Sequence, residues 1–335
     1  MKVLKGYKFR MYPTEEQKQF FIETFGCVRF TYNHLLVERQ HHLQWVEEES
    51  LITPASLKKD YPFLKKTDSL ALSNAQRNLD RAFKNYFSGR AGYPKLKTKK
   101  DPWQSYTTNN QKHTIYFDKD QVKLPKLKSL IAVHQHRSIN GKIKSATISA
   151  KENKEFYISI LCVEEVFPLT KTHQSVGIAY CPNQLLELSQ NLCVSELNQH
   201  PLEKKMTREK HKLQVRARVA KKRKVRLENA KNYQKQKQKV EVLLKAKRDQ
   251  KKDFIDQLTY QLVANYDQLF IENDPVFSEE LAITFSETDW QFFLYKIQYK
   301  ADWYGKKVTF VSLANTLQKN KSREIEKIGL QINNL

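Results

Sequence analysis

An acidic residue at the end of a buried strand is the first feature of this sequence that could bind a catalytic metal ion. The apolar run Tyr266–Glu272 reads as such a strand and ends in Glu272. The segment Ser175–Asn183, SVGIAYCPN, predicts a second buried strand that leads to a hairpin turn. Its middle residue, Ala179, has no oxygen to offer a metal. Two-metal phosphodiester hydrolysis needs several carboxylates around cations about 4 Å apart, so these strands supply one candidate ligand and one position without a ligand.

Cysteine and glycine usage excludes two other kinds of chemistry. The four cysteines, Cys27, Cys162, Cys181 and Cys193, never approach C-x-x-C spacing, so a zinc site is not expected and they are interpreted as reduced thiols. The chain has only eight glycines and no Gly-rich phosphate loop, which excludes a nucleotide-hydrolysing motor.

Charge indicates the class of partner. The 335 residues include 59 Lys and Arg against 36 Asp and Glu, a net charge of +23. Such an excess on a chain long enough for two or three domains favours a polyanionic partner, most simply nucleic acid. No run of eighteen apolar residues occurs, and the N-terminal residues lack the apolar core of a signal peptide. We therefore expect a cytoplasmic, nucleoid-associated protein with no membrane partner.

The cations concentrate in Glu203–Lys252, which holds 21 Lys and Arg but only five Asp and Glu, a balance of +16. The stretch lacks Pro and Gly, so two long helices are expected, with a turn near Glu228–Gln234. A thin apolar seam would join them, at Val240, Leu244, Ile255, Leu258 and Leu262. A solvated basic helix is the plain alternative, but this much like charge repels itself without a counterion. Binding by this surface should depend strongly on salt.

The first half of the chain predicts a small barrel interrupted by helices. Val3–Tyr12 alternates like a strand, and Thr14 with Gln17 forms a capping box for a first helix, in which Gly26 offers a kink or cap. Further helices are expected at Phe30–Val46 and at Ser69–Phe87. The strands that would complete the barrel are Ser105–Thr108, Thr114–Phe117, Gln121–Lys123, Ala132–His136, Ala146–Ser149 and Phe156–Val163. Because a lone strand cannot stand by itself, these segments predict one split domain.

The last part of the chain predicts a helix over Ser286–Tyr304 and a strand over Lys307–Leu313, followed by a polar tail, Asn315–Leu335. Several motifs along the chain can be taken together: KGYKFRMYPTEEQ, GCVRFTYNHLL, GYPKLKTKK, SYTTNN, SVGI, RDQKKDFIDQLTYQLVANYDQLFIEN and YKADWYGKKVTFV. In this order they resemble the TnpB family of RNA-guided nucleases encoded by IS200/IS605-type transposons. The resemblance covers nearly the whole chain.

The resemblance implies an α+β multidomain fold. Residues 1–10 and 101–172 would form a β-barrel wedge domain, and residues 11–100 a helical recognition insert. Residues 173–335 would form an RNase H-like (RuvC) α/β domain with a basic helical pair at about 203–262 and without the zinc-finger module.

The family's catalytic acids can be carried over singly. The first Asp falls on Ala179, the second acid is retained as Glu272, and the tail KIGLQINN places Lys327 at the third position. On this reading Glu272 is a vestigial acid, and the chain is a TnpB-like nuclease-dead repressor, not an enzyme, that needs no zinc and no Mg²⁺. Two alternatives remain: an active RNA-guided DNA endonuclease with rearranged acids, and a general RNA-binding protein.

The implied partners are a scaffold-plus-guide RNA and a double-stranded target DNA with a flanking motif. The cations expected to bind RNA are Lys204, Lys205, Arg208, Lys212, Arg216, Arg218, Lys221, Lys222, Arg223, Lys224, Arg226, Lys235, Lys239, Lys247 and Arg248. The residues expected to read the DNA motif are Ser69, Ser73, Asn74, Arg77, Asn109 and Asn110. Ser69 is equally interpreted as a helix N-cap. Trp103 and Tyr106 would either stack on RNA bases or pack in the barrel core.

Overall fold

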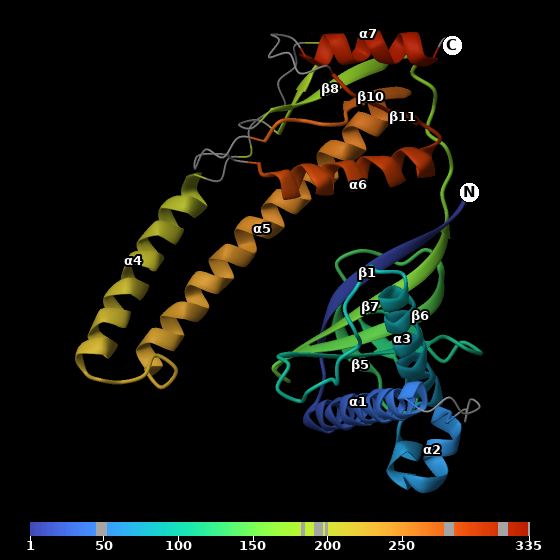
Figure 1. Cartoon of the computed structure of the whole chain (residues 1–335), viewed down its shortest axis with the longest axis vertical. Coiled ribbons are helices and arrows are strands. Elements are labelled where there is room, and N and C mark those ends of the chain that lie inside the picture. The colour runs from blue at the N-terminus through green and yellow to red at the C-terminus, as the bar shows by residue number, and fades with distance from the viewer. Residues whose placement is uncertain are drawn as a thin grey trace. The chain divides into compact units, whose positions relative to one another are not determined.

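The computed structural model describes residues 1–44, 52–181, 185–190, 197, 200–277, 285–313 and 321–333 (Figure 1). They form two compact units. The first is Lys2–Glu165, and the second is Met1 together with Val166–Leu335.

The first unit contains a seven-stranded antiparallel sheet in the order β2-β6-β7-β1-β5-β4-β3. Its strands are β1 (Lys2–Tyr12), β2 (Trp103–Asn109), β3 (Tyr116–Asp118), β4 (Gln121–Lys123), β5 (Ile131–His134), β6 (Lys142–Lys151) and β7 (Glu155–Glu165). Burial alternates along β1, with Tyr7, Phe9 and Met11 inside. The period of two places the intervening Lys8 and Arg10 on the outer face. The expected strands are thus confirmed with small changes of boundary.

Four helical segments accompany this sheet: α1 (Glu15–Gln44), α2 (Pro54–Asp60), the 3-10 turn η1 (Pro62–Lys66) and α3 (Ser69–Phe87). The capping box before α1 is confirmed, because the Thr14 N–H donates to Gln17 Oε1 at 3.0 Å and the Gln17 N–H to Thr14 Oγ1 at 3.3 Å. The expected break at Gly26 is wrong, and α1 runs through it. A single glycine costs a helix only about 1 kcal/mol, and burial of Phe21, Phe25 and Val28 outweighs this.

The second unit contains a four-stranded sheet in the order β11-β10-β8-β9. It is built from β8 (Ser175–Cys181), β9 (Leu185–Leu188), β10 (Gln268–Glu272) and β11 (Lys307–Val311). Strand β10 lies parallel to both β8 and β11, whereas β9 is antiparallel to β8. The two buried strands expected from sequence are confirmed. The turn expected between β8 and β9 lies outside the described residues.

Helices α4 (His200–Lys222) and α5 (Lys231–Asn265) form the expected helical pair, called the basic hairpin below (Figure 1). Its seam differs by one position from the prediction, since Leu243 is buried beside Val240 whereas Leu244 is exposed. The other predicted seam residues pack elsewhere. Ile255 and Leu262 join a core with residues of the sheet and of α6 (Glu287–Tyr304). The first half of α5 therefore belongs to the basic hairpin, and its second half packs against the sheet.

The tail contains a helix, α7 (Lys321–Asn333), where the sequence predicted only a polar tail. Its buried residues Ser322, Ile325 and Gly329 recur at helical spacing. The helix approaches the sheet very closely at two glycines. A Cβ added at Gly177 would lie 1.9 Å from the Ser322 carbonyl oxygen, and one at Gly329 would lie 2.0 Å from the Phe270 ring. Only glycine permits this packing of α7 on β8 and β10.

Three of the four cysteines lie in the described parts of the chain, and each is a free thiol. Cys27 and Cys162 are buried and Cys181 is half-buried. Cys193 lies outside the described residues. None of the helices that the structure describes is long and apolar enough to cross a membrane.

Candidate functional site

A row of residues across three strands contains both strand positions singled out from the sequence. Ala179 of β8 is paired with Glu187 of β9. The parallel register of Ile178 with Ile271 places the next residue of β10, Glu272, on the other side of Ala179. The row therefore reads Glu187, Ala179, Glu272. Sequence reasoning missed Glu187, since only the hairpin register brings it opposite Ala179.

The carboxylates of this row contact α7 and the β8 backbone. Glu272 is 3% exposed. Its Oε2 accepts the Tyr180 N–H at 2.8 Å, and its Oε1 lies 3.4 Å from Lys321 Nζ. Glu187 Oε1 accepts the Ser322 hydroxyl at 2.8 Å. Lys327, assigned to the third acid position, is exposed on α7. The residue of α7 that meets Glu272 is Lys321.

The chemistry of this donor set can be tested against a divalent cation. Mg²⁺ takes oxygen ligands in an octahedral arrangement. At this row Glu272 already holds a backbone N–H and an ammonium group, and Ala179 supplies no oxygen. Within the residues that the structure describes, no group of three or more His, Cys, Asp or Glu is placed to hold a metal ion. The donors in the part of the chain that the structure describes do not fit a metal pair.

The basic hairpin carries the cations that were expected to bind RNA. Thirteen of these fifteen side chains are exposed, and Arg216 and Lys247 are half-buried. Both half-buried cations join the two helices. Arg216 donates to the Asn232 carbonyl at 2.8 Å, and Lys247 forms an ion pair with Glu203 at 2.5 Å. The helices thus present an exposed surface of dense positive charge, which fits a polyanion.

A buried polar contact sets the register of the basic hairpin. Gln236 of α5 donates to Glu209 of α4, at 2.7 Å to Oε2 and at 3.0 Å to the backbone carbonyl. Hydrogen bonds from Lys212 and Gln236 lower the pKa of the Glu209 carboxyl to about 2, so Glu209 is ionised at neutral pH. Among so many charged residues, no sequence pattern indicated this contact.

The residues expected to read DNA divide into two groups. Asn74 of α3 meets β2, donating to the Thr107 carbonyl at 3.0 Å and to Asn109 Oδ1 at 3.3 Å. Ser69 and Arg77 are exposed and Ser73 is half-buried on the same helix. Asn110 is not part of this group. Its side-chain Nδ2 donates to the Ile115 carbonyl at 3.0 Å and to the Ile143 carbonyl at 3.2 Å. Its Oδ1 accepts the Ile115 N–H at 2.9 Å.

Three interpretations left open by the sequence are decided by the structure. The N-cap of α3 is Asp68, not Ser69, whose hydroxyl contacts Lys58 Nζ at 2.5 Å. Tyr106 packs in the core, with its ring centroid 5.8 Å from Phe25. Trp103 stays 46% exposed.

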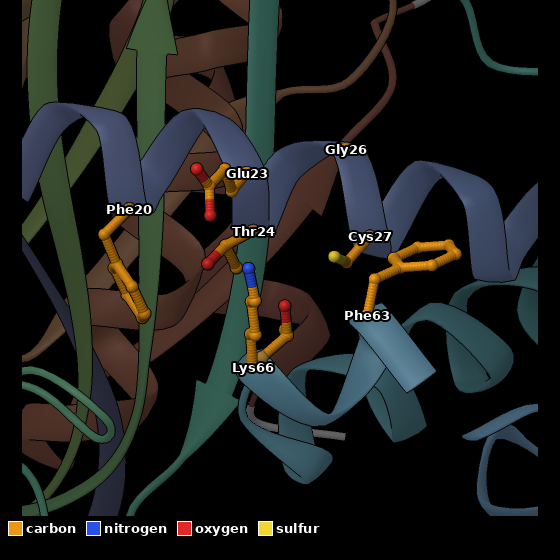
Figure 2. A pocket seen from close by; sticks show the side chains of 8 residues that line it. Phe20, Glu23, Thr24, Gly26, Cys27, Phe63 and Lys66 are labelled. Carbon is orange, nitrogen blue, oxygen red and sulfur yellow. The ribbon is translucent and has the colours of Figure 1, made fainter. Parts of the chain in front are cut away.

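A pocket of about 310 Å³ lies between α1 and η1 (Figure 2). Phe20 and Phe63 supply aromatic walls, and Glu23, Thr24 and Lys66 supply polar groups. Its other lining residues are Gly26, Cys27 and Thr67. The pocket contains no pairing of a nucleophile with a base, so it is not a candidate catalytic site.

Comparisons with known proteins bear on these surfaces. The chain is 27% identical over 325 residues to a putative RNA-guided DNA endonuclease of Streptomyces pristinaespiralis, which covers 92% of this chain and 77% of the relative. It is 26% identical over 288 residues to the putative RNA-guided DNA endonuclease InsQ of Escherichia coli, which covers 82% of this chain and 67% of the relative.

The fold has a relative among solved structures. The cryo-EM structure of a Cas12f1–sgRNA–target DNA complex matches with a TM-score of 0.55 at 11% identity, over 99% of this chain and 98% of the other. The chain therefore has an α+β fold similar to that of Cas12f1.

These comparisons overturn one expectation. The lack of an acid at Ala179 and at the third position, Lys327, led to the prediction that the chain is not an enzyme. The two relatives described above are named as RNA-guided DNA endonucleases, which points to an enzyme, so that prediction is wrong. The prediction weighed only the assigned acid positions, whereas the strand register places a further carboxylate, Glu187, beside Ala179.

The N-terminal residues of the chain match a family model. Residues 1–45 match the helix-turn-helix domain of IS605 OrfB proteins. Together with the two endonuclease relatives, this match supports a relationship of the chain to the TnpB (IS605 OrfB) family.

Proposed function

We propose that this protein holds a guide RNA and, directed by it, binds double-stranded DNA beside a short flanking motif, where the R-loop represses transcription. The observation that carries the proposal is the basic hairpin, whose exposed cations fit a phosphate backbone. The relatives named as RNA-guided DNA endonucleases support it. So does the solved relative, a complex of Cas12f1 with sgRNA and target DNA.

Different groups bind the RNA and recognise the target sequence. Cations of the hairpin hold the RNA backbone without regard to sequence, whereas pairing between guide and target reads sequence. Asn74 and Asn109, whose amides contact each other, are proposed to read the flanking motif, because amides pair well with adenine edges. Target binding of this kind requires neither zinc nor Mg²⁺.

Domain roles follow the expected boundaries. Residues 1–10 and 101–172 act as the wedge domain, residues 11–100 as the recognition insert, and residues 173–335 as the RuvC-like domain. In this assignment the row Glu187, Ala179, Glu272 lies on the RuvC-like sheet.

The decisive experiment is to purify the full-length protein from its host and to sequence the RNA that accompanies it. The expected result is one discrete small RNA whose 3′ part matches a site in the host genome. RNA-free protein that binds an operator sequence-specifically would make it an ordinary repressor. A heterogeneous RNA population would make it a general RNA-binding protein. Either outcome overturns the proposal.

Repression has its own test. A reporter promoter that contains the matched target and motif is expressed with the protein and its RNA. Transcripts should fall at least about tenfold when the guide matches, and unchanged transcripts would overturn the repressor role. Cleavage of the same target is scored in parallel, because the names of the relatives point to it.

Motif reading can be tested with a matched pair of variants. Asn109→Ala should relax the preference for the motif about tenfold with little change in stability. Asn110→Ala should instead lower stability, because its amide closes a loop within the first unit. Motif preference in a binding series and the midpoint of thermal unfolding separate the two effects. Equal motif preference in Asn109→Ala and wild type would remove Asn109 from the proposal.

A further inference from the structure

The first turn of α7 contacts both carboxylates of the row Glu187, Ala179, Glu272. Lys321 Nζ lies 3.4 Å from Glu272 Oε1, and the next residue, Ser322, donates its hydroxyl to Glu187 Oε1 at 2.8 Å. Ala179 is 1% exposed and packs in an apolar cluster that includes a residue of α7. Consecutive residues of one helix therefore meet the two carboxylates on either side of Ala179.

The position of Lys321 is fixed by the helix that carries it. Glu326 Oε1 accepts the Ser175 hydroxyl at 2.5 Å, and Arg323 Nε donates to the Ser189 carbonyl at 3.2 Å. The close contacts at the two glycines of this interface add to these hydrogen bonds. The ammonium group of Lys321 is thus held against the row by contacts other than its own ion pair.

The buried carboxylate of Glu272 needs a partner of opposite charge. Its side chain is 4% exposed. A carboxylate removed from water is strongly destabilising unless hydrogen-bond donors and a cation replace its hydration. The Tyr180 N–H meets one oxygen of Glu272, and Lys321 supplies positive charge at the other. The folded chain thus provides both from its own residues.

A divalent cation would have to displace this arrangement. Mg²⁺ and Mn²⁺ prefer several oxygen ligands. Each oxygen of Glu272 already has a partner, and Ala179 supplies no oxygen. The Lys321 ammonium can only donate hydrogen bonds, and its charge repels an incoming cation. The row therefore suits the ammonium that it contacts better than it suits a metal ion.

We infer that the Lys321 ammonium is the built-in counter-cation of this row and takes the role that a divalent cation has in acid-lined metal sites. The same ion pair fastens the start of α7 to the end of β10. The row takes up neither Mg²⁺ nor Mn²⁺ while α7 is docked. The inference is independent of the proposed function, because guide-directed binding of DNA needs no cation at this row.

The first test is a metal titration of the full-length protein. The midpoint of thermal unfolding is followed with MgCl₂ or MnCl₂ up to about 10 mM at constant ionic strength, in wild type and in Glu272→Gln. The metal-induced shift should agree within about 1 °C between the two proteins, because a ligand that does not bind the row cannot stabilise it. A saturable rise in wild type that is lost in Glu272→Gln would place a metal ion at the row and overturn the inference.

A double-mutant cycle tests the ion pair itself. Lys321→Met and Glu272→Gln should each lower the midpoint by about 5 °C, because each leaves the other group without its partner. The double variant should lose clearly less than the sum of the two losses. Lys321→Arg, which keeps the charge, should retain most of the midpoint. Additive losses in the double variant would overturn the inference and leave the proposed function intact.

The matched control for Lys321 is Lys327→Met, since Lys327 is an exposed cation on the same helix. It should shift the midpoint by less than about 1 °C. A loss equal to that of Lys321→Met would show that the total charge of α7, and not the ion pair with Glu272, stabilises the fold. That result would also overturn the inference. Circular dichroism checks that each variant is folded.

Discussion

The basic hairpin and the four-stranded sheet of the second unit are built by opposite means. On the hairpin most side chains are exposed, and the helices touch through a few groups such as Val240 and the Glu209–Gln236 pair. In the sheet, every residue of β8 from Val176 to Tyr180 is buried. Helix α7 packs so closely on β8 that only glycine fits at position 177. Exposed side chains of the hairpin can therefore be replaced without destabilising the fold, whereas the stability of the sheet depends on close packing. Three predictions test this contrast.

The largest effect is expected where α7 meets the sheet. Gly177→Ala places a Cβ 1.9 Å from the Ser322 carbonyl oxygen, a backbone atom that cannot step aside. Overpacking of this severity should lower the free energy of unfolding by about 3 kcal/mol. Denaturant titration of the purified protein measures it.

Gly26→Ala is the matched control. Gly26 is half-buried in regular structure, within α1, and nothing lies within 4 Å of the added Cβ. It should stabilise the protein by about 0.5 kcal/mol, since it narrows the unfolded ensemble. Equal effects at the two glycines would contradict the contrast.

A smaller effect is expected at Asp267, at the start of β10. Its carboxylate pairs with the buried Lys306 at 2.5 Å and accepts the N–H groups of Thr172 and His173 at 2.9 and 2.7 Å. Burial raises the pKa of this carboxyl, but the hydrogen bonds outweigh burial and hold the pKa well below its usual range. Asp267→Asn should cost about 2 kcal/mol at pH 7.

The pH dependence of that difference has a definite sign. A depressed carboxyl pKa adds stability above the unfolded value of about 4, and this stability is lost as the pH falls further. The gap between wild type and Asp267→Asn should therefore be constant near neutrality and should shrink below about pH 4. Asp302→Asn, at an exposed site on α6, should change stability by less than about 0.5 kcal/mol at any pH. A gap that widens in acid would refute the assignment.

The smallest effect on the fold is expected on the hairpin. Replacing Lys221 and Lys222 by Gln removes two exposed cations. RNA affinity should fall about tenfold, equivalent to about 1.4 kcal/mol, and the salt slope should drop by about 1.5. The free energy of unfolding should stay within about 0.5 kcal/mol.

The control for this pair is Lys59→Gln with Lys65→Gln, two exposed cations of the first unit. Fluorescence anisotropy across a salt series, alongside thermal unfolding, compares them. Equal losses of RNA affinity in both pairs would show that net charge, and not the hairpin surface, governs binding.

Local signals in the sequence predicted much of this fold. The Thr14–Gln17 box marked the start of α1, and the charge pattern without Pro or Gly gave both long helices. The predictions that failed concern residues whose structure depends on contacts with residues distant in the chain. Helix α7 was missed because its buried face is completed by Phe270 and Gly177, and Gly26 was misread because tertiary burial overrides a weak helix propensity.

The candidate site followed the same rule. Residue type and strand pattern located Ala179 and Glu272, but the neighbours that define their chemistry, Glu187 and Lys321, depend on register and on α7. The pairing of Asn74 with Asn109 likewise joins a helix to a strand 35 residues away.

The docking of α7 also sets an order of assembly during synthesis. All strands of the seven-stranded sheet are made before β8, so the first unit can finish folding while the rest of the chain is still being made. The second unit cannot, because the side of β8 and β10 that presents Ala179 and Phe270 is covered by α7, which follows all of its strands in the chain. Until α7 emerges, that apolar surface stays open to other chains, and the interval before α7 docks is when this protein is most exposed to aggregation.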